Sequence, residues 1–180
     1  MIYLFLADGF EECEALAPLD ILRRGGTQVK TVGVGKEYIT GTHGITVKAD
    51  ILEGQVVLDD KLQGVILPGG MPGTNNLESN ETVKRSVSFA NENQKLVCAI
   101  CAAPKILGGM GLLNNKNATC FPGFEKDLIG AKLSSDYVVQ DGNVITAKGV
   151  GVAFDFGFKI LENLTDKTTV EDLRKKMQFS

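Results

Sequence analysis

The chain has 180 residues, of which 43% are hydrophobic and 23% are charged. This composition is typical of a compact protein, and the length predicts a single domain over residues 1–180. Acidic residues outnumber basic ones by 22 to 19, and the net charge of -3 predicts no basic surface for nucleic acid or anionic lipid. We therefore expect neither nucleic-acid nor membrane partners.

The first apolar run, residues 2–7, has no basic flank and ends at Asp8. It is too short for a signal peptide or a membrane span, so we predict a cytoplasmic protein. The four cysteines are too few for a disulfide scaffold. The single histidine, His43, excludes a His-rich zinc site within one chain, and we expect no metal.

Apolar runs alternate with amphipathic segments along the chain. The expected strands are residues 2–7, 28–34, part of 48–58, 62–67 and 95–100. The expected helices are residues 14–24, 81–93, 103–110, 151–164 and 170–177. Two further short strands, 137–140 and 143–147, flank Asp141-Gly142, a dipeptide that favours tight turns. This order predicts an α/β fold with a parallel sheet covered on both faces and a hairpin at its edge.

Cys101 is the strongest candidate for chemistry. It follows the strand 95–100 and precedes the helix 103–110, so its side chain is expected at the carboxyl edge of the sheet. The N-terminus of the following helix favours a thiolate there, and we expect Cys101 to ionise more readily than an ordinary thiol.

The other three cysteines, Cys13, Cys98 and Cys120, are expected to act as small core hydrophobes. Cys98 and Cys101 have the spacing of a redox dithiol. However, three residues of extended chain, at about 3.3 Å each, separate the two by roughly 10 Å. That separation is beyond the reach of a disulfide, so we do not expect a thioredoxin-like role.

An acidic loop, residues 8–14, follows the first strand. Its last member, Glu14, is expected to turn toward the cleft, where a protonated carboxyl can donate to a thiolate. Glu11 and Glu12 are expected to form a solvated acidic helix start. His43 lies in a distant loop, and we expect a surface residue that serves as a general base only if folding brings it to Cys101.

A glycine-rich loop follows the strand 62–67. Residues 68–73 offer backbone N–H groups that suit an oxyanion or an oxidised sulfur. The loop lacks the Lys-Ser/Thr of a phosphate-binding loop, so we expect no nucleotide and no other cofactor.

Five motifs in order resemble the DJ-type branch of the ThiJ/PfpI superfamily. They are residues 7–14 (ADGFEECE), 19–26 (LDILRRGG), 67–70 (LPGG), 99–104 (AICAAP) and 145–149 (ITAKG). The resemblance implies a flavodoxin-like three-layer sandwich with a mostly parallel central sheet and an edge hairpin, commonly as a homodimer. It also implies that Cys101 is the reactive cysteine, that Glu14 is its protonated partner, and that the backbone of Gly70 and Ala102 supplies oxyanion-type donors.

The resemblance implies a role in oxidative and carbonyl stress. Cys101 would be oxidised to a sulfinate by peroxide, or would attack small reactive carbonyls as a deglycase or a glutathione-independent glyoxalase. Two alternatives stay open: a PfpI-like cysteine hydrolase acting as an amidase or peptidase, and a non-enzymatic redox-regulated chaperone. Phe121 stands where relatives carry a histidine, which predicts weak enzymatic activity. Lys148 and Val150 replace an arginine and a proline, and we expect milder effects from these two changes.

Overall fold

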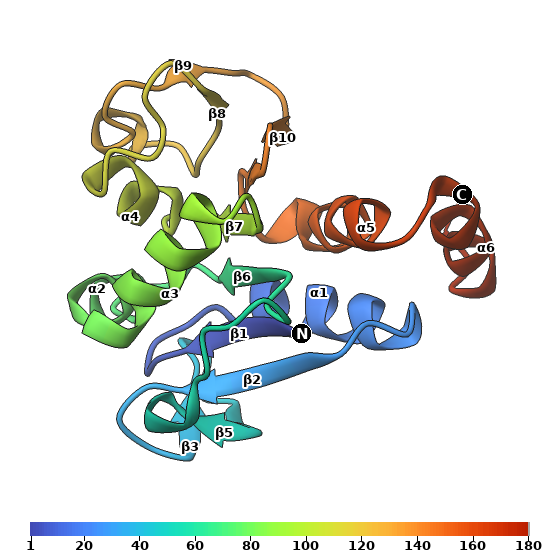
Figure 1. Ribbon diagram of the computed structural model, residues 1–180, viewed down its shortest axis with the longest axis horizontal. Coiled ribbons are helices and arrows are strands. Elements are labelled where there is room, and N and C mark those ends of the chain that lie inside the picture. The colour runs from blue at the N-terminus through green and yellow to red at the C-terminus, as the bar shows by residue number, and fades with distance from the viewer. Residues whose placement is uncertain (180) are drawn as a thin grey trace.

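The computed structural model describes residues 1–179, and a seven-stranded sheet forms its centre (Figure 1). The strand order is β10-β11-β7-β6-β1-β2-β5. Every neighbouring pair is parallel except β10 with β11, which form an antiparallel hairpin at one edge. The bounds are β1 (Ile2–Leu6), β2 (Val29–Gly33), β5 (Ile51–Leu52), β6 (Gly64–Leu67), β7 (Leu96–Ile100), β10 (Val138–Asp141) and β11 (Val144–Ala147).

Two apolar cores lie on opposite faces of this sheet. Along β1, Ile2, Leu4 and Leu6 belong to one core, whereas Tyr3 and Phe5 belong to the other. A strand buried on both faces needs apolar side chains at every position, which explains the uninterrupted apolar run in the sequence.

Helices cover both faces and complete the three layers. One core is covered by α1 (Glu12–Arg24) and α5 (Ala153–Leu164), which pack against each other. The other is covered by α2 (Gly73–Ser79), α3 (Glu81–Glu92) and α4 (Pro104–Gly109). The last helix, α6 (Lys167–Lys176), packs on α5. The predicted α/β sandwich with its mostly parallel sheet and edge hairpin is thereby confirmed. The predicted single domain stays a prediction, and its boundary at Ser180 lies outside the described residues.

Several short elements were not expected from the sequence. A small antiparallel hairpin is formed by β3 (Tyr38–Thr40) and β4 (Thr46–Lys48), and a second small sheet by β8 (Asn117–Ala118) and β9 (Lys132–Leu133). Helix α2 replaces part of an expected loop, because only one large apolar side chain, Leu77, marks its buried face. Three short 3-10 turns also occur in the part of the chain that the structure describes: η1 (Glu53–Gln55), η2 (Glu125–Asp127) and η3 (Val150–Val152).

The sheet topology brings three loops to one place. Strands β1, β6 and β7 are parallel neighbours in the order β7-β6-β1, so their carboxyl ends lie at the same edge of the sheet. Gly70 and Cys101 lie directly after β6 and β7, and Glu14 lies in the first turn of α1, which follows β1. Side chains and backbone donors from segments far apart in the sequence therefore meet there. Within residues 1–179, no helix has both the length and the apolar character needed to cross a membrane.

Candidate active site

Cys101 lies on a sharp bend directly after β7. Its φ of +65° falls in the left-handed region, which non-glycine residues seldom adopt and which costs conformational energy. Hydrogen bonds on both sides hold the bend: the Cys101 N–H donates to the Ala147 carbonyl at 2.9 Å, and the Phe121 N–H donates to the Cys101 carbonyl at 2.9 Å. The surrounding structure therefore fixes the direction of the cysteine side chain.

Hydrogen-bonding groups from three loops surround the Cys101 sulfur. The backbone N–H groups of Ala102 and Gly70 donate to it, and the Glu14 carboxyl is its side-chain partner. Gly69 completes the arrangement, because its N–H donates to Glu14 Oε2 at 3.0 Å. The structure thus brings together the four residues that the sequence and its resemblance singled out.

Gly69 is a site residue that the sequence analysis did not single out individually. A Cβ at this position would lie 2.5 Å from Glu14 Oε2 and 2.6 Å from Cys101 Cβ. No side chain fits between the carboxyl and the cysteine, so glycine is required for the two to approach. The signal was present in the sequence, since Gly69 belongs to the glycine-rich loop already considered.

Glu14 is only 1% exposed, and burial raises its pKa to about 7. The negative charge of Glu11 acts in the same direction, whereas hydrogen bonds from Cys101 and from the N–H groups of Gly69 and Val150 lower the pKa. Desolvation dominates because a carboxylate loses more hydration than these donors return. Glu14 therefore titrates near neutral pH.

The Cys101 thiol does not ionise more readily than an ordinary one when Glu14 is charged. Burial, the Glu14 carboxylate and its hydrogen bond raise the pKa of Cys101 to about 12, although the N–H groups of Ala102 and Gly70 lower it. The expectation that Cys101 ionises more readily than an ordinary thiol was therefore wrong. Helix α4 has six residues, so its dipole is small, and a carboxylate lies beside the sulfur.

Glu14 and Cys101 are better described as one unit that shares a proton. Removing the first proton, near the Glu14 pKa of about 7, leaves one negative charge on the pair. The remaining proton lies either on the sulfur beside a carboxylate or on Glu14 beside a thiolate. The second arrangement holds a nucleophile that the N–H groups of Gly70 and Ala102 stabilise.

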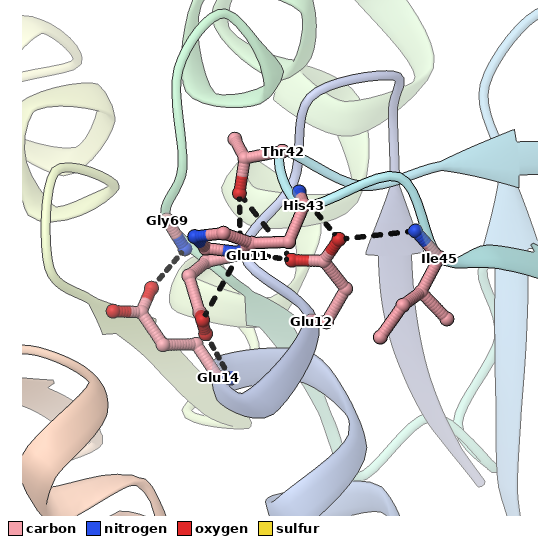
Figure 2. A network of polar contacts seen from close by, with 7 residues as sticks. All are labelled: Glu11, Glu12, Glu14, Thr42, His43, Ile45 and Gly69. Carbon is pink, nitrogen blue, oxygen red and sulfur yellow. Dashed lines mark hydrogen bonds and ion pairs between the residues drawn. The ribbon is translucent and has the colours of Figure 1, made fainter.

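The Glu12 side chain points away from that of Glu14 (Figure 2). It is 3% exposed, and it accepts hydrogen bonds from His43 Nδ1 at 2.8 Å and from the His43 N–H at 2.7 Å. Thr42 Oγ1 and the Ile45 N–H donate to it as well, at 3.3 and 3.4 Å. Burial raises the pKa of Glu12, but these hydrogen bonds outweigh burial and lower it to about 2. The expectation of a solvated Glu12 was wrong, because the β3–β4 hairpin covers the helix start.

Glu11 caps helix α1, where its Oε2 accepts from the Glu14 N–H at 2.7 Å. Its other oxygen lies 4.0 Å from His43 Nδ1. The Glu12 hydrogen bond and charge raise the pKa of His43, which is exposed. The chain's only imidazole is therefore paired with Glu12.

Among residues 1–179, Glu11, Glu12 and His43 form a cluster whose spacing suits a metal ion, with ligand atoms within 4.8 Å of one another. They lie at the N-terminus of α1, whose dipole disfavours a cation. The atoms of Glu12 and His43 that would bind an ion already bond each other. In this arrangement, the hydrogen bonds between Glu12 and His43 hold the β3–β4 hairpin against helix α1.

The remaining cysteines differ in exposure. Cys98 and Cys120 are buried, as expected, and burial raises the pKa of both. Cys13 is exposed, so its assignment to the core was wrong. Burial and the neighbouring carboxylates of α1 raise the pKa of Cys13. The Cys13 thiol is accessible to solvent, but it lacks the hydrogen-bond donors that surround the Cys101 sulfur.

The chain has a mostly parallel sheet, and a cysteine lies on the sharp bend after a central strand, hydrogen-bonded to a buried carboxyl. These features define an α/β protein with a nucleophile elbow. The model of the DJ-1/PfpI family matches residues 1–163, and the chain belongs to this family.

Several relatives resemble this chain over nearly its whole length. Protein dj-1beta of Drosophila melanogaster is 34% identical over 175 residues, which cover 96% of this chain and 93% of the relative. A deglycase of Pyrococcus abyssi is 31% identical over 83% of this chain and 90% of its own length. The crystal structure of a DJ-1 superfamily protein from Salmonella typhimurium superposes with a TM-score of 0.93 at 32% identity, covering 99% of this chain and 98% of that one.

Proposed function

We propose that this protein acts in oxidative and carbonyl stress through Cys101. The observation that carries the proposal is the set of hydrogen bonds around one sulfur: the Glu14 carboxyl on one side, and the N–H groups of Gly70 and Ala102 on the other. Membership of the DJ-1/PfpI family and the likeness to a protein named deglycase support a DJ-1-like, stress-related role.

Peroxide is the first class of reactant. The Cys101 thiolate attacks one peroxide oxygen and the O–O bond breaks. Glu14 gives its proton to the leaving oxygen, so water departs and a sulfenic acid remains. A second peroxide adds another oxygen and releases another water, which yields the sulfinate. The N–H groups of Gly70 and Ala102 suit the negative charge on the sulfinate oxygens.

Small reactive carbonyls are the second class of reactant. A bond forms between the Cys101 sulfur and the carbonyl carbon as the C=O π bond opens. The oxygen takes the proton that Glu14 carries, which leaves a neutral hemithioacetal and a Glu14 carboxylate. Both reactions use the same proton on the same carboxyl.

The hydrolase alternative receives no support from the geometry. An amidase of that kind needs an imidazole near its cysteine, and His43 is paired with Glu12. The family resemblance implies a histidine at the position of Phe121, so we expect turnover to be weak. The chaperone alternative makes a different prediction, namely that protection of aggregating proteins persists in a Cys101→Ala variant.

Mass spectrometry after graded peroxide treatment tests the proposal. We expect Cys101 to gain two oxygens before any other cysteine reacts. Cys13 is the built-in control, because it is exposed but lacks the donors of the elbow. Oxidation of Cys13 ahead of Cys101, or equal oxidation of all four cysteines, would contradict the proposal.

A homodimer, a cytoplasmic location, and the lack of cofactor, nucleic-acid and membrane partners stay predictions. Sedimentation equilibrium of the purified protein measures the first directly. We expect a mass twice that of the 19.3 kDa chain.

A further inference from the structure

An open groove of ≈ 400 Å³ lies beside the elbow. Its main lining side chains are Phe121, Pro122, Tyr137, Lys148, Val150 and Val152. Phe121 and Pro122 lie in the loop after β8, Tyr137 and Lys148 flank the β10–β11 hairpin, and Val150 and Val152 belong to turn η3. The groove therefore forms only in the folded chain.

The groove shares a wall with the Glu14–Cys101 pair. A Cβ at Gly149 would lie 3.2 Å from the Phe121 ring and 3.8 Å from Glu14 Oε1, so the ring and the carboxyl flank the same glycine. The Phe121 N–H bonds the Cys101 carbonyl, and the Val150 N–H bonds Glu14. A molecule that reacts at the sulfur therefore has the groove next to it.

The groove has an apolar character that matters for ligand choice. Phe121 is 47% exposed, and Tyr137 and Val150 are exposed large apolar side chains beside it. The one charged side chain is Lys148, whose Nζ lies 4.9 Å from the centre of the Tyr137 ring. A hydrocarbon or aryl group gains contact with these surfaces when it leaves water, whereas a polyhydroxylated sugar chain does not.

We propose that this groove selects reactive aldehydes that carry an aryl or hydrocarbon group, and that Phe121 determines this specificity. The inference rests on the proposed carbonyl chemistry and names its substrate class. The aldehyde carbon bonds the Cys101 sulfur, the C=O π bond opens, and the oxygen takes the Glu14 proton. The aryl or alkyl group lies along Phe121 and Val150. Phe121 positions the substrate and takes no part in the proton transfer.

A protection assay measures this preference. Cys101 is alkylated by iodoacetamide in the presence of phenylglyoxal or methylglyoxal, and the modified peptide is quantified by mass spectrometry. The ratio of half-protecting concentrations for the two aldehydes is divided by the same ratio for N-acetylcysteine, which removes their intrinsic difference in electrophilicity. The assay uses the wild-type chain, Phe121→Ser, Phe121→Leu and the control Ile129→Ser. Ile129 is 61% exposed and does not line the groove.

We expect a normalised preference of about tenfold for phenylglyoxal in the wild-type chain, since a well-placed apolar contact contributes a factor of this order. The preference falls close to one in Phe121→Ser, stays largely intact in Phe121→Leu, and is unchanged in Ile129→Ser. Circular dichroism and the melting temperature show whether Phe121→Ser is folded. If it is not, Phe121→His takes its place, and the same fall in preference relative to Phe121→Leu is expected.

Several results would overturn the inference. A wild-type preference near one, or an unchanged preference in Phe121→Ser, shows that the groove does not select. A Phe121→Ser variant that changes the sedimenting mass but not the preference shows that a second copy of the chain covers the groove. Failure of both aldehydes to protect wild-type Cys101 refutes the proposed carbonyl chemistry itself. That outcome is distinct, because it is seen before any preference is measured.

Discussion

Glu12 and Glu14 lie two residues apart at the start of α1, and both are almost fully buried, at 3% and 1% exposure. Their ionisation is nevertheless opposite, because the pKa of Glu12 is lowered to about 2 and that of Glu14 is raised to about 7. Burial alone does not decide the charge of a carboxyl. The difference lies both in the depth of burial, since Glu12 lies beside the exposed His43 whereas Glu14 lies deeper, and in the donors that each receives from other parts of the chain.

Glu12 receives donors from the β3–β4 hairpin, including an imidazole that can carry a positive charge. Glu14 receives two backbone N–H groups and a thiol, which is a weak donor. The first carboxylate holds a hairpin against a helix. The second is left close to neutrality beside a sulfur, where it can supply a proton.

The largest expected effect comes from removing the sulfur. Cys101→Ser lowers aldehyde consumption at least about 100-fold, because the hydroxyl is a far weaker nucleophile than the thiolate at neutral pH. The matched control, Cys13→Ser, removes an exposed thiol outside the pair and retains wild-type rates. The measurement is the initial rate of methylglyoxal loss, and similar rates in the two variants would refute the assignment of Cys101.

The next largest effect distinguishes the role of Glu14 from that of Glu12. Glu14→Gln slows methylglyoxal loss at pH 7 by about 10- to 100-fold, since the carbonyl oxygen loses the carboxyl that supplies its proton. Glu12→Gln changes the same rate less than about twofold, because its bonds reach the hairpin and not the sulfur. The initial rate of methylglyoxal loss checks both. If the two variants slowed equally, Glu14 would have no special role.

The two variants also differ in the sign of their effect on stability. The pKa of Glu14 is raised from 4.5 to about 7, so its contribution is present below pH 4.5 and is lost as the pH rises through 7. Glu14→Gln is therefore expected to raise the free energy of unfolding at pH 8, by up to about 3 kcal/mol, and to leave it nearly unchanged at pH 4.

For Glu12 the direction is reversed. Its pKa is lowered from 4.5 to about 2, so its contribution is present above pH 4.5 and is lost as the pH falls through 2. Glu12→Gln is expected to lower the free energy of unfolding at pH 7 by about 2 kcal/mol, since buried N–H groups lose a charged acceptor. Urea denaturation measures the free energy of unfolding of Glu14→Gln at pH 8 and of Glu12→Gln at pH 7. Changes of the same sign in the two variants would contradict the comparison.

The smallest effect concerns His43. Its pKa is raised by the Glu12 hydrogen bond, so the stability it contributes is present below its ordinary value of 6.5 and is lost as the pH rises through the raised value. His43→Gln is expected to lower the melting temperature slightly at pH 5.5 and not at pH 9.5. Thermal scans at the two pH values check this. The rate of Cys101 alkylation should stay within about twofold of wild type, and a larger loss would restore His43 as a candidate base.

The fold could be predicted from the sequence, because its strands are uninterrupted apolar runs and its edge hairpin contains a turn dipeptide. It also located Cys101, since a cysteine between a buried strand and a helix must lie at the edge of a parallel sheet. The part played by Glu14 followed from its position just inside the helix start after β1, together with the family resemblance. These features depend on local pattern or on a general rule of topology.

The features that sequence missed depend on packing between distant segments. Glu12 is buried by Thr42, His43 and Ile45, about 30 residues further along the chain, and no local pattern indicates that contact. Cys13 is exposed because α1 packs on α5 through its other face. The raised pKa of Cys101 could not be read from helix position, because it depends on the charge of Glu14 beside it.

The pH dependence of Cys101 alkylation in the wild-type chain is the most direct test of the shared proton. Reactivity should rise with a midpoint near pH 7, because loss of the first proton from the pair, at the Glu14 pKa of about 7, creates the form in which Glu14 can hold the remaining proton beside a thiolate. In Glu14→Gln the midpoint should move to higher pH, since the buried thiol must then ionise alone. A wild-type midpoint at 8.5 or above that does not move when Glu14 is replaced would contradict the account.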